Sequence, residues 1–265
     1  MPLASVHTLN RKQLAVLHEL YRFRIATIQQ LANELNITNI RLLYKRMDIL
    51  IKNDLVDRTF ESSYRLTHKP ATYHLTKNGS RALRSLNIPN YSPTVLSNIS
   101  RTKKPSEKFI QSSLGILDIH EILKTTYKDK ITLFTASETA IYPYFPKKRP
   151  DLYIQHQGIR KLKQYFLLYL ESNKPMYVNI RRIKDYSEYI SEGEWDITNT
   201  PSPALLLVCD RPQLIKRMLS AIYNMDDDVD NELDILIASK EALLTKTKNA
   251  PWINIFEPDI VIKPF

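Results

Sequence analysis

Glycine is scarce in this 265-residue chain, which has only four, at positions 79, 115, 158 and 193. Because no Gly-rich loop is available to cradle phosphates, the sequence argues against nucleotide-driven motors and dinucleotide-dependent enzymes. The single cysteine, Cys209, excludes an internal disulfide and a thiolate zinc cluster. Cys209 lies in the apolar run 204–209, which predicts a buried structural thiol.

Long hydrophobic runs are missing as well. The longest, such as 166–170 and 204–209, have the length of a strand and not of a membrane span. The N-terminus lacks the apolar core of a signal peptide, so we expect a cytoplasmic protein with no membrane partner. Hydrophobic residues make up 43% and charged residues 25% of the chain, as in a soluble globular protein.

Acidic residues are few in the N-terminal part of the chain. Residues 1–90 hold 14 Lys and Arg against 6 Asp and Glu, a net charge of +8. Residues 191–265 hold 7 against 13, a net charge of −6, and the whole chain carries +10. The basic N-terminal part indicates a polyanionic partner, because Lys and Arg side chains that neutralise phosphates release counterions, which favours binding. The alternative is a basic surface that is merely solvated.

The first ninety residues contain three helical patterns in quick succession. Asn10 can cap a first helix, and Thr27 with Gln30 forms a capping box that opens a second, short helix. Thr38 can cap a third helix that runs to about Asn53, with apolar residues at helical spacing. The tight connection between the second and third helices predicts a helix-turn-helix.

A hairpin pattern follows these helices. Residues 55–59 and 71–75 have strand character and flank the polar, basic segment 61–70, and a helix over 76–86 closes the unit. The phrase from Tyr73 to Gly79 resembles the end of the wing in winged-helix proteins. We therefore expect a winged helix-turn-helix DNA-binding domain over residues 8–88.

In such a domain the third helix lies in the major groove. Its exposed face offers Asn39, Arg41, Tyr44, Lys45 and Arg46. The wing region supplies Arg58, Arg65, His68 and Lys69. Asn and Arg can read base edges, whereas Lys and Tyr more often hold phosphates, so these nine residues are the candidate DNA contacts. The alternative is a solvated face of a winged helix that contacts proteins.

The remaining chain predicts a linker and a second domain. Residues 89–105 are rich in Pro, Ser and basic residues, which indicates a linker. Residues 106–265 alternate between a long helix to about 127, strands at 131–136, 152–155 and 166–171, a helix at 178–190, a strand at 204–209, a helix at 213–223 and a strand at 233–238. This order predicts an α/β domain with a central mixed sheet. The final segment, 252–262, is expected as an edge strand or packing arm.

Two carboxylates are expected at one end of that sheet. Asp151 begins one strand and Glu171 ends the next, so antiparallel pairing through the loop near 156–163 brings them to the same end. This resembles the PD-(D/E)XK nuclease fold, which implies a restriction-endonuclease-like domain. The resemblance implies Mg²⁺ or Mn²⁺ bound by Asp151 and Glu171, with Glu121 as a further acid.

The expected catalytic lysine is missing from its usual position. Asn173 stands there, and strand alternation would point the adjacent Lys174 away from Glu171. Lys184 on the following helix is the better substitute. A structural alternative exists for each acid, since Asp151 can cap a turn after Pro150 and Glu171 can pair with Lys184 or Arg181. The sequence therefore favours a nuclease-like domain without catalysis and without a cofactor over an active Mg²⁺- or Mn²⁺-dependent nuclease.

Over its whole length the chain resembles the replication-relaxation family of plasmids and mobile elements. The resemblance rests on the winged-helix pattern, on the motifs 118–121, 149–151 and 166–171, and on a basic helix with Lys184 and Tyr186. It implies a sequence-directed double-stranded DNA-binding protein acting in replication, mobilisation or their control. Its expected partners are duplex DNA, a second copy of the chain, and replication, transfer or transposition proteins. The alternatives are a site-specific or transposon-end endonuclease and a winged-helix transcriptional regulator.

Overall fold

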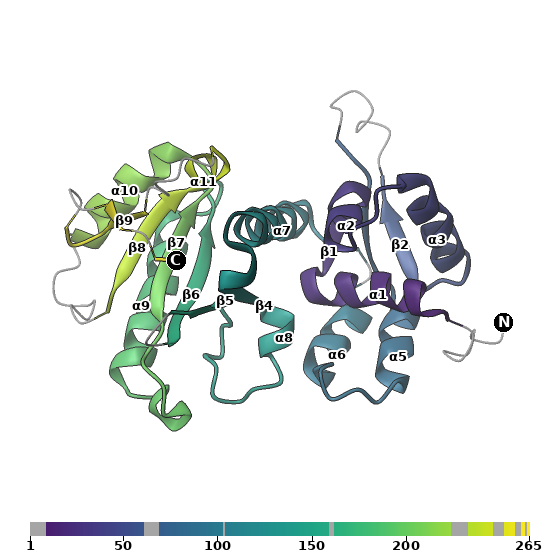
Figure 1. The fold of residues 1–265 in the computed structure, drawn as a ribbon, viewed down its shortest axis with the longest axis horizontal. Helices are drawn as coiled ribbons and strands as arrows, with labels where there is room; N and C mark the ends of the chain where they lie inside the picture. The colour runs from purple at the N-terminus through teal and green to yellow at the C-terminus, as the bar shows by residue number, and fades with distance from the viewer. Residues whose placement is uncertain are drawn as a thin grey trace. The chain divides into compact units, whose positions relative to one another are not determined.

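The computed structural model describes residues 9–60, 69–102, 104–158, 162–223, 233–245, 252–257, 261–262 and 264–265. The chain divides into two compact units, Met1–Glu121 and Ile122–Phe265, and the boundary falls within one long helix, α7 (Glu107–Tyr127). Figure 1 shows the helices and strands of both units. Within the described part of the chain, no helix combines the length and apolarity that crossing a membrane requires.

The first unit is mainly helical, with one small sheet. Its elements before α7 are α1 (Arg11–Phe23), β1 (Ile25–Thr27), α2 (Ile28–Glu34), α3 (Ile40–Lys52), β2 (Val56–Thr59), β3 (Thr72–Leu75), α5 (Lys77–Ser85) and α6 (Pro93–Arg101). The three strands form an antiparallel sheet in the order β1-β3-β2. This element order agrees with the sequence-based expectation, and β1 is an addition to it.

The helix starts of this unit follow from local capping. Asn10 and Gln13 form a capping box at α1, and Thr27 and Gln30 form the expected one at α2. At α3 the N-cap is Asn39, whose side chain accepts a hydrogen bond from the backbone of Arg41 at 3.1 Å. The prediction of Thr38 as this cap is therefore wrong by one residue, because both side chains can cap and only the position of the turn decides.

Gly79 fixes α5 against the turn before β2. A Cβ atom at this position would lie 2.1 Å from the carbonyl oxygen of Leu55, so only glycine allows the close approach. Thr76, the N-cap of α5, strengthens the same contact by donating from its hydroxyl to the carbonyl of Asp54 at 2.6 Å. The segment 73–79, which suggested the end of a wing in the sequence, therefore ends where α5 contacts the turn before β2.

The segment 89–105 is not an extended linker. It contains α6, which begins after the N-cap Ser92 and buries Leu96 and Ile99 in the core of the first unit. The backbone N–H of Ser92 donates to the hydroxyl of Tyr21 on α1 at 2.8 Å. The first unit therefore extends well beyond residue 88 and takes in α6 and most of α7.

The second unit is a mixed α/β structure, as predicted. Its elements after α7 are η2 (Lys128–Lys130), β4 (Ile131–Thr135), α8 (Ala136–Thr139), β5 (Leu152–Gln157), β6 (Leu162–Leu170), α9 (Met176–Ser191), η3 (Asp196–Thr198), β7 (Ala204–Cys209), α10 (Pro212–Tyr223), β8 (Ile235–Ser239), α11 (Lys240–Leu244), β9 (Trp252–Asn254) and β10 (Val261–Ile262). The described strands form one sheet in the order β10-β9-β8-β7-β6-β5-β4.

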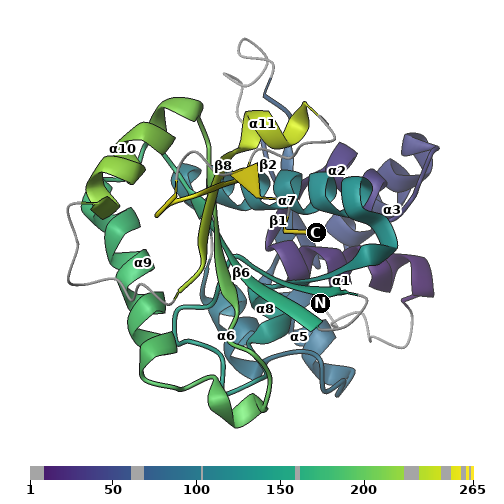
Figure 2. The same cartoon turned by 60° about the vertical axis from the view of Figure 1, so that its left-hand side comes forward.

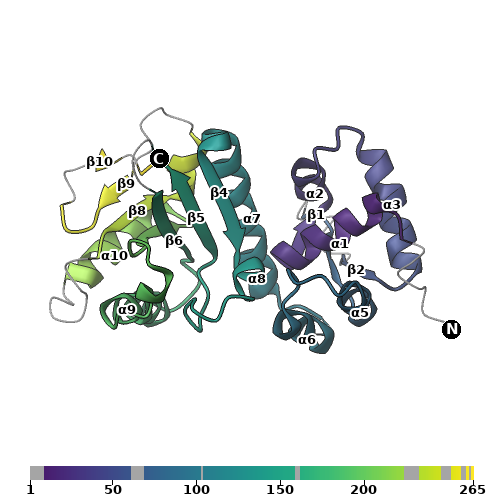
Figure 3. The same ribbon diagram turned by 60° about the horizontal axis from the view of Figure 1, so that its bottom comes forward.

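The sheet has a parallel centre with antiparallel edges. β6 pairs with β7, and β7 with β8, in parallel, whereas the other described pairs are antiparallel. Figures 2 and 3 show α9 and α10 on one face of the strands β6 to β8. Ile183 of α9 and Met218 of α10 pack there with Phe166 of β6 and Leu207 of β7. This burial on the sheet explains the continuous apolar runs of β6 and β7.

Candidate functional site

Helix α3 of the first unit presents a mixed face to solvent. Leu43, Met47 and Leu50 are buried, so the opposite side of the helix is exposed. The predicted contacts Arg41, Tyr44 and Lys45 lie on this exposed side, while Arg46 is half-buried at its edge. Asn39 is engaged as the N-cap, so its amide supports the start of α3.

Two apolar side chains on α3 were missed by reasoning from sequence. Leu42 and Ile49 are 47% and 45% exposed, one helical heptad apart, beside the basic residues. Their spacing was visible in the sequence, because both fall off the stripe formed by Leu43, Met47 and Leu50. An exposed apolar edge beside basic residues can contact thymine methyl groups as well as another protein.

The wing residues are only partly described. Arg58 is exposed, with its guanidinium 5.8 Å from the ring centre of Phe60. Lys69 forms an ion pair with Glu107 at 3.1 Å, and both side chains are about half exposed. An exposed pair of this kind is worth only about 0–1 kcal/mol, so a phosphate could replace Glu107. The predicted contacts Arg65 and His68 lie outside the described residues.

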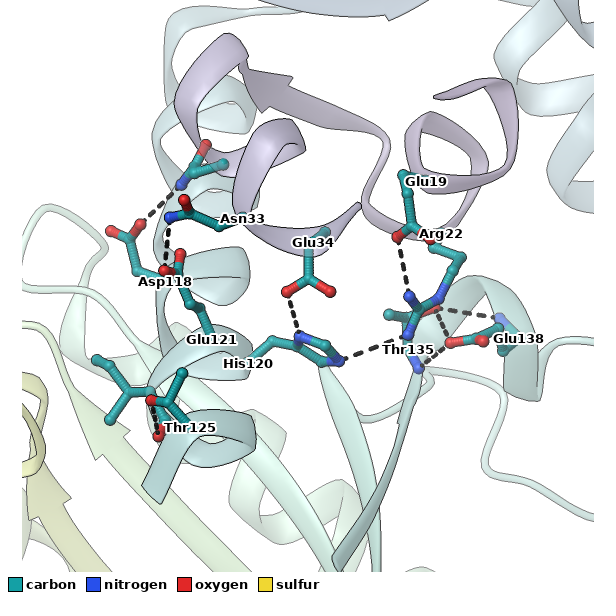
Figure 4. Close-up of polar contacts among 12 residues, drawn as sticks. Glu19, Arg22, Asn33, Glu34, Asp118, His120, Glu121, Thr125, Thr135 and Glu138 are labelled. Atoms are coloured by element: carbon teal, nitrogen blue, oxygen red, sulfur yellow. Dashed lines mark hydrogen bonds and ion pairs between the residues drawn. The ribbon is translucent and has the colours of Figure 1, made fainter. Parts of the chain in front are cut away.

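The motif 118–121 of α7 contacts α2 within the first unit. Gln30 donates to Asp118 at 2.7 Å, and Asn33 donates to Glu121 at 2.6 Å. His120 Nδ1 lies 2.9 Å from a carboxylate oxygen of Glu34, and both side chains are almost fully buried. Figure 4 shows Asn33 and Glu34 of α2 facing Glu121 and His120 of α7. Glu121, predicted as a further nuclease acid, has its carboxylate directed to Asn33.

His120 also connects α7 to α1. Arg22 Nη2 lies 3.5 Å from His120 Nε2, and Arg22 forms an ion pair with Glu19 at 2.9 Å. A guanidinium can only donate, so the Nε2 atom facing it is the acceptor and Nδ1 carries the proton that Glu34 accepts. Burial raises the pKa of Glu19, and the neighbouring Arg22 counteracts part of that rise.

The two predicted nuclease acids lie at the same end of the sheet in the second unit. Asp151 directly precedes β5, where its N–H donates to Leu167 of β6 at 3.0 Å. Glu171 directly follows β6 and is only 3% exposed. The antiparallel register of β5 and β6, with Leu152 opposite Leu167, brings both residues to this end. Their shared location could be predicted from strand order alone.

Each acid is compensated by a basic side chain. Arg182 of α9 donates to Asp151 at 2.9 Å and to the carbonyl of Tyr169 at 3.2 Å. Burial alone would lower the pKa of Arg182, but Asp151, with smaller contributions from Tyr186 and Glu171, outweighs burial and the pKa is raised. Lys174 forms an ion pair with Glu171. The expectation that Lys174 points away from Glu171 is therefore wrong, because β6 ends at Leu170 and the following turn brings the Lys174 side chain back toward Glu171.

This arrangement does not fit a resident divalent cation. Mg²⁺ and Mn²⁺ need several oxygen ligands with uncompensated negative charge, whereas Asp151 and Glu171 each already face a cation. Within the part of the chain that the structure describes, no three His, Cys, Asp or Glu side chains are grouped to hold a metal ion. Lys184, the predicted substitute lysine, is half-buried on α9, and Arg182 is the α9 cation that bonds Asp151.

Fold and site together define a two-unit protein with a mixed α/β second unit and a neutralised carboxylate pair. The sequence profile of the replication-relaxation family matches residues 17–202, and the chain belongs to this family. Membership supports a replication-related function associated with DNA. No curated protein matches the chain.

Two solved structures of the restriction endonuclease FokI are similar to the chain at low levels. The free enzyme is 13% identical with a TM-score of 0.32, over 89% of this chain and 43% of FokI. FokI bound to DNA is 14% identical with a TM-score of 0.33, over 88% and 43%. The chain thus spans less than half of FokI, and scores this low carry no argument about fold or activity.

Proposed function

We propose that the chain is a sequence-directed double-stranded DNA-binding protein of a plasmid or mobile element, acting in replication, mobilisation or their control. The first unit reads DNA as a winged helix-turn-helix, with α3 as its recognition helix. The second unit is a nuclease-like scaffold that does not cleave. The observation that carries the proposal is the exposed face of α3, with Arg41, Tyr44 and Lys45 opposite a buried apolar stripe.

The charge distribution along the chain supports the assignment of DNA binding to the first unit. Residues 1–90 carry a net charge of +8, so long-range attraction draws the first unit to a polyanion. On α3 itself Asp48 is also exposed, and it lies on the same face as Arg41 and Lys45, seven and three residues after them, so it offsets part of their positive charge. Arg41 and Lys45 lie in the first half of α3, the part of a recognition helix that comes nearest the base edges. Phosphate contacts would supply affinity, and Arg41 would supply discrimination.

The absence of cleavage is proposed from the charge balance at the end of the sheet. An acid pair that is to attract Mg²⁺ needs spare negative charge, and here Arg182 and Lys174 supply two positive charges to Asp151 and Glu171. Incubating the chain with supercoiled plasmid and Mg²⁺ or Mn²⁺ is expected to give no nicked product.

Selection from a random duplex library, followed by fluorescence anisotropy at several salt concentrations, tests the DNA-binding proposal. We expect Arg41→Ala to weaken binding by about 1–3 kcal/mol and to relax base preference at one position. The matched control is Lys216→Ala, which removes one exposed positive charge from α10 of the second unit. Failure to select any sequence, or equal binding by Arg41→Ala and wild type, would reject α3 as the reader.

A metal-dependent endonuclease is the second candidate function. The observation that favours it is the Oδ1 atom of Asn179, a buried oxygen without a hydrogen-bond partner on a side chain whose amide reaches the carbonyl of Glu171 at 3.4 Å. A spare buried acceptor close to the backbone of Glu171 suits a cation or a water molecule. Nicking that requires Mg²⁺ or Mn²⁺ and is lost in both Asp151→Ala and Glu171→Ala would establish this function and refute the silent scaffold.

A further inference from the structure

An open groove lies between α5 and α6 of the first unit, and neither the family nor the proposed function assigns it a role. Its volume is about 860 Å³. The two helices are held together beneath it, since Ser80 donates to the carbonyl of Leu96 at 2.6 Å and Ser100 donates to Ser80 at 3.1 Å. The groove is therefore built on a fixed pair of helices.

The groove combines basic ends with an apolar floor. Arg84 of α5 and Arg101, the last residue of α6, line it together with Leu83, Ile88, Pro89 and Pro93. Ile88 is 43% exposed and lines the groove next to Pro89 and Pro93, so an apolar side chain of a ligand could cover it. Among the described residues that line the groove, none is acidic.

The charge of the surrounding segment has one sign. Residues 76–106 contain six Lys and Arg and no Asp or Glu. Arg84 donates a long hydrogen bond to the carbonyl of Pro93, at 3.4 Å, and Arg101 is exposed at the end of its helix. Both guanidinium groups can turn toward carboxylates, which they bind through two parallel hydrogen bonds.

We propose that the α5–α6 groove binds an acidic, partly apolar peptide segment of a partner protein. Carboxylates of the segment pair with Arg84 and Arg101, and one or two apolar side chains cover Ile88 and Pro89. This is the arrangement by which grooves between helices take amphipathic segments. Replication, transfer or transposition proteins of the same element are the class of partner that this chemistry would serve.

A nucleic-acid backbone is the other polyanion, and the groove suits it less well. A row of phosphates gains nothing from burying Ile88, Pro89 and Pro93, and it would meet only two arginines along the lining. Within the first unit, α5 and α6 lie on one side of α1, whereas α2 lies on the other (Figures 1 and 3). A peptide in the groove therefore leaves α2 and α3 accessible, so partner binding and DNA binding can coexist.

A random dodecapeptide library displayed on phage tests the proposal with the full-length chain. We expect selected peptides to carry acidic residues next to apolar ones. As free fluorescein-labelled peptides they should bind Arg84→Glu/Arg101→Glu at least tenfold more weakly than wild type. Arg81→Glu is the matched control, because Arg81 is exposed on the same helix, outside the groove lining, and its peptide affinity should stay within twofold.

Circular dichroism verifies that the double variant is folded, and Ile88→Ser provides an uncharged second test of the floor. The proposal is overturned if no peptide is selected, if the selected peptides are not acidic, or if the double variant binds them as well as wild type does. It is equally overturned if duplex DNA displaces the peptide from wild type and binding of that DNA requires Arg84 and Arg101, since the groove would then be a nucleic-acid site.

Discussion

Replacing Arg182 with methionine tests whether a basic side chain takes the place of a metal at the end of the sheet. Arg182 donates to Asp151 and to the carbonyl of Tyr169, at 2.9 and 3.2 Å. Methionine keeps most of the aliphatic length on α9 but removes the charge and both donors. The variant therefore leaves Asp151 as a partly buried carboxylate whose remaining described hydrogen bond is from the backbone N–H of Tyr169, at 2.7 Å.

The magnitude follows from burial and hydrogen bonding. Removing one partner of a fully buried ion pair costs about 3–5 kcal/mol. Here the side chains of Asp151 and Arg182 both keep 18% of their exposure, so water can recover part of this loss. We expect Arg182→Met to lower the free energy of unfolding by about 2–3 kcal/mol. Asp151→Asn combined with Arg182→Met should cost only about 1 kcal/mol, because no unpaired charge remains.

Urea unfolding followed by tryptophan fluorescence measures this difference. Both tryptophans of the chain, Trp195 and Trp252, are buried in the second unit, so the signal reports on the unit that contains the mutation. Wild type, the two single variants and the double variant form a double-mutant cycle. Because Arg182→Met costs about 2–3 kcal/mol and the double variant about 1 kcal/mol, the coupling energy between Asp151 and Arg182 is expected to be at least about 1–2 kcal/mol, to which any cost of Asp151→Asn adds.

Two results would refute the reasoning. A loss below about 0.5 kcal/mol for Arg182→Met would mean that the pair contributes no more than an exposed ion pair. A Mg²⁺-dependent gain in the stability of wild type that disappears in Asp151→Asn would mean that the carboxylates bind metal despite Arg182. That result would also refute the proposal that the second unit is a scaffold that does not cleave DNA.

Three further predictions follow from single buried positions. Gly79→Ala should destabilise the first unit by about 2 kcal/mol or more, because its Cβ would lie 2.1 Å from the Leu55 carbonyl; an unchanged melting temperature would contradict the close contact. Burial lowers the pKa of His74, partly opposed by Asp57, so its neutral form stabilises the fold above pH 6.5 and this stability is lost as pH falls through the lowered pKa. His74→Leu should therefore flatten the fall in unfolding free energy below pH 6.5, and an equally steep fall would exclude His74 as its source. Burial raises the pKa of Cys209 to about 12, so a thiol reagent at pH 8 should label it only after unfolding; rapid labelling of the native chain would refute this.

Much of the fold could be predicted because it depends on neighbouring residues. The capping box of Thr27 and Gln30 and the apolar spacing of α3 are local signals, and both were read correctly. The antiparallel β5–β6 pair could be derived in the same way, since its strands are close in sequence and strongly apolar. From that register alone, Asp151 and Glu171 were placed at the same end of the sheet.

Proline misled the prediction of a linker. Pro89, Pro93 and Pro105 suggested a chain without helix, yet Pro93 is the first residue of α6, directly after the cap Ser92. Proline is well suited to this position, because its fixed φ angle matches the helix and its missing N–H would have no helical partner. Helix α6 is held by the burial of Leu96 and Ile99 against parts of the first unit that are distant in sequence, and no local pattern reveals such contacts.

The partners of the acidic residues were the least predictable part of the candidate site. Alternation along a strand predicts where Lys174 points only as long as the strand continues, and β6 stops four residues earlier. Glu121 looked like a free acid in sequence, but its partner Asn33 lies 88 residues away on α2. Residue types alone do not distinguish a carboxylate that is available to bind a metal from one that already accepts a hydrogen bond from another side chain.

The charge balance at the end of the sheet also bears on DNA binding. A carboxylate pair without a metal repels phosphates, so it would oppose the approach of DNA to this end of the sheet. Arg182 and Lys174 remove this repulsion by neutralising Asp151 and Glu171. Lys174→Met should therefore weaken DNA binding at low salt more than the loss of one exposed lysine elsewhere, such as Lys216→Met. Equal effects of the two variants would mean that DNA does not approach this end of the sheet.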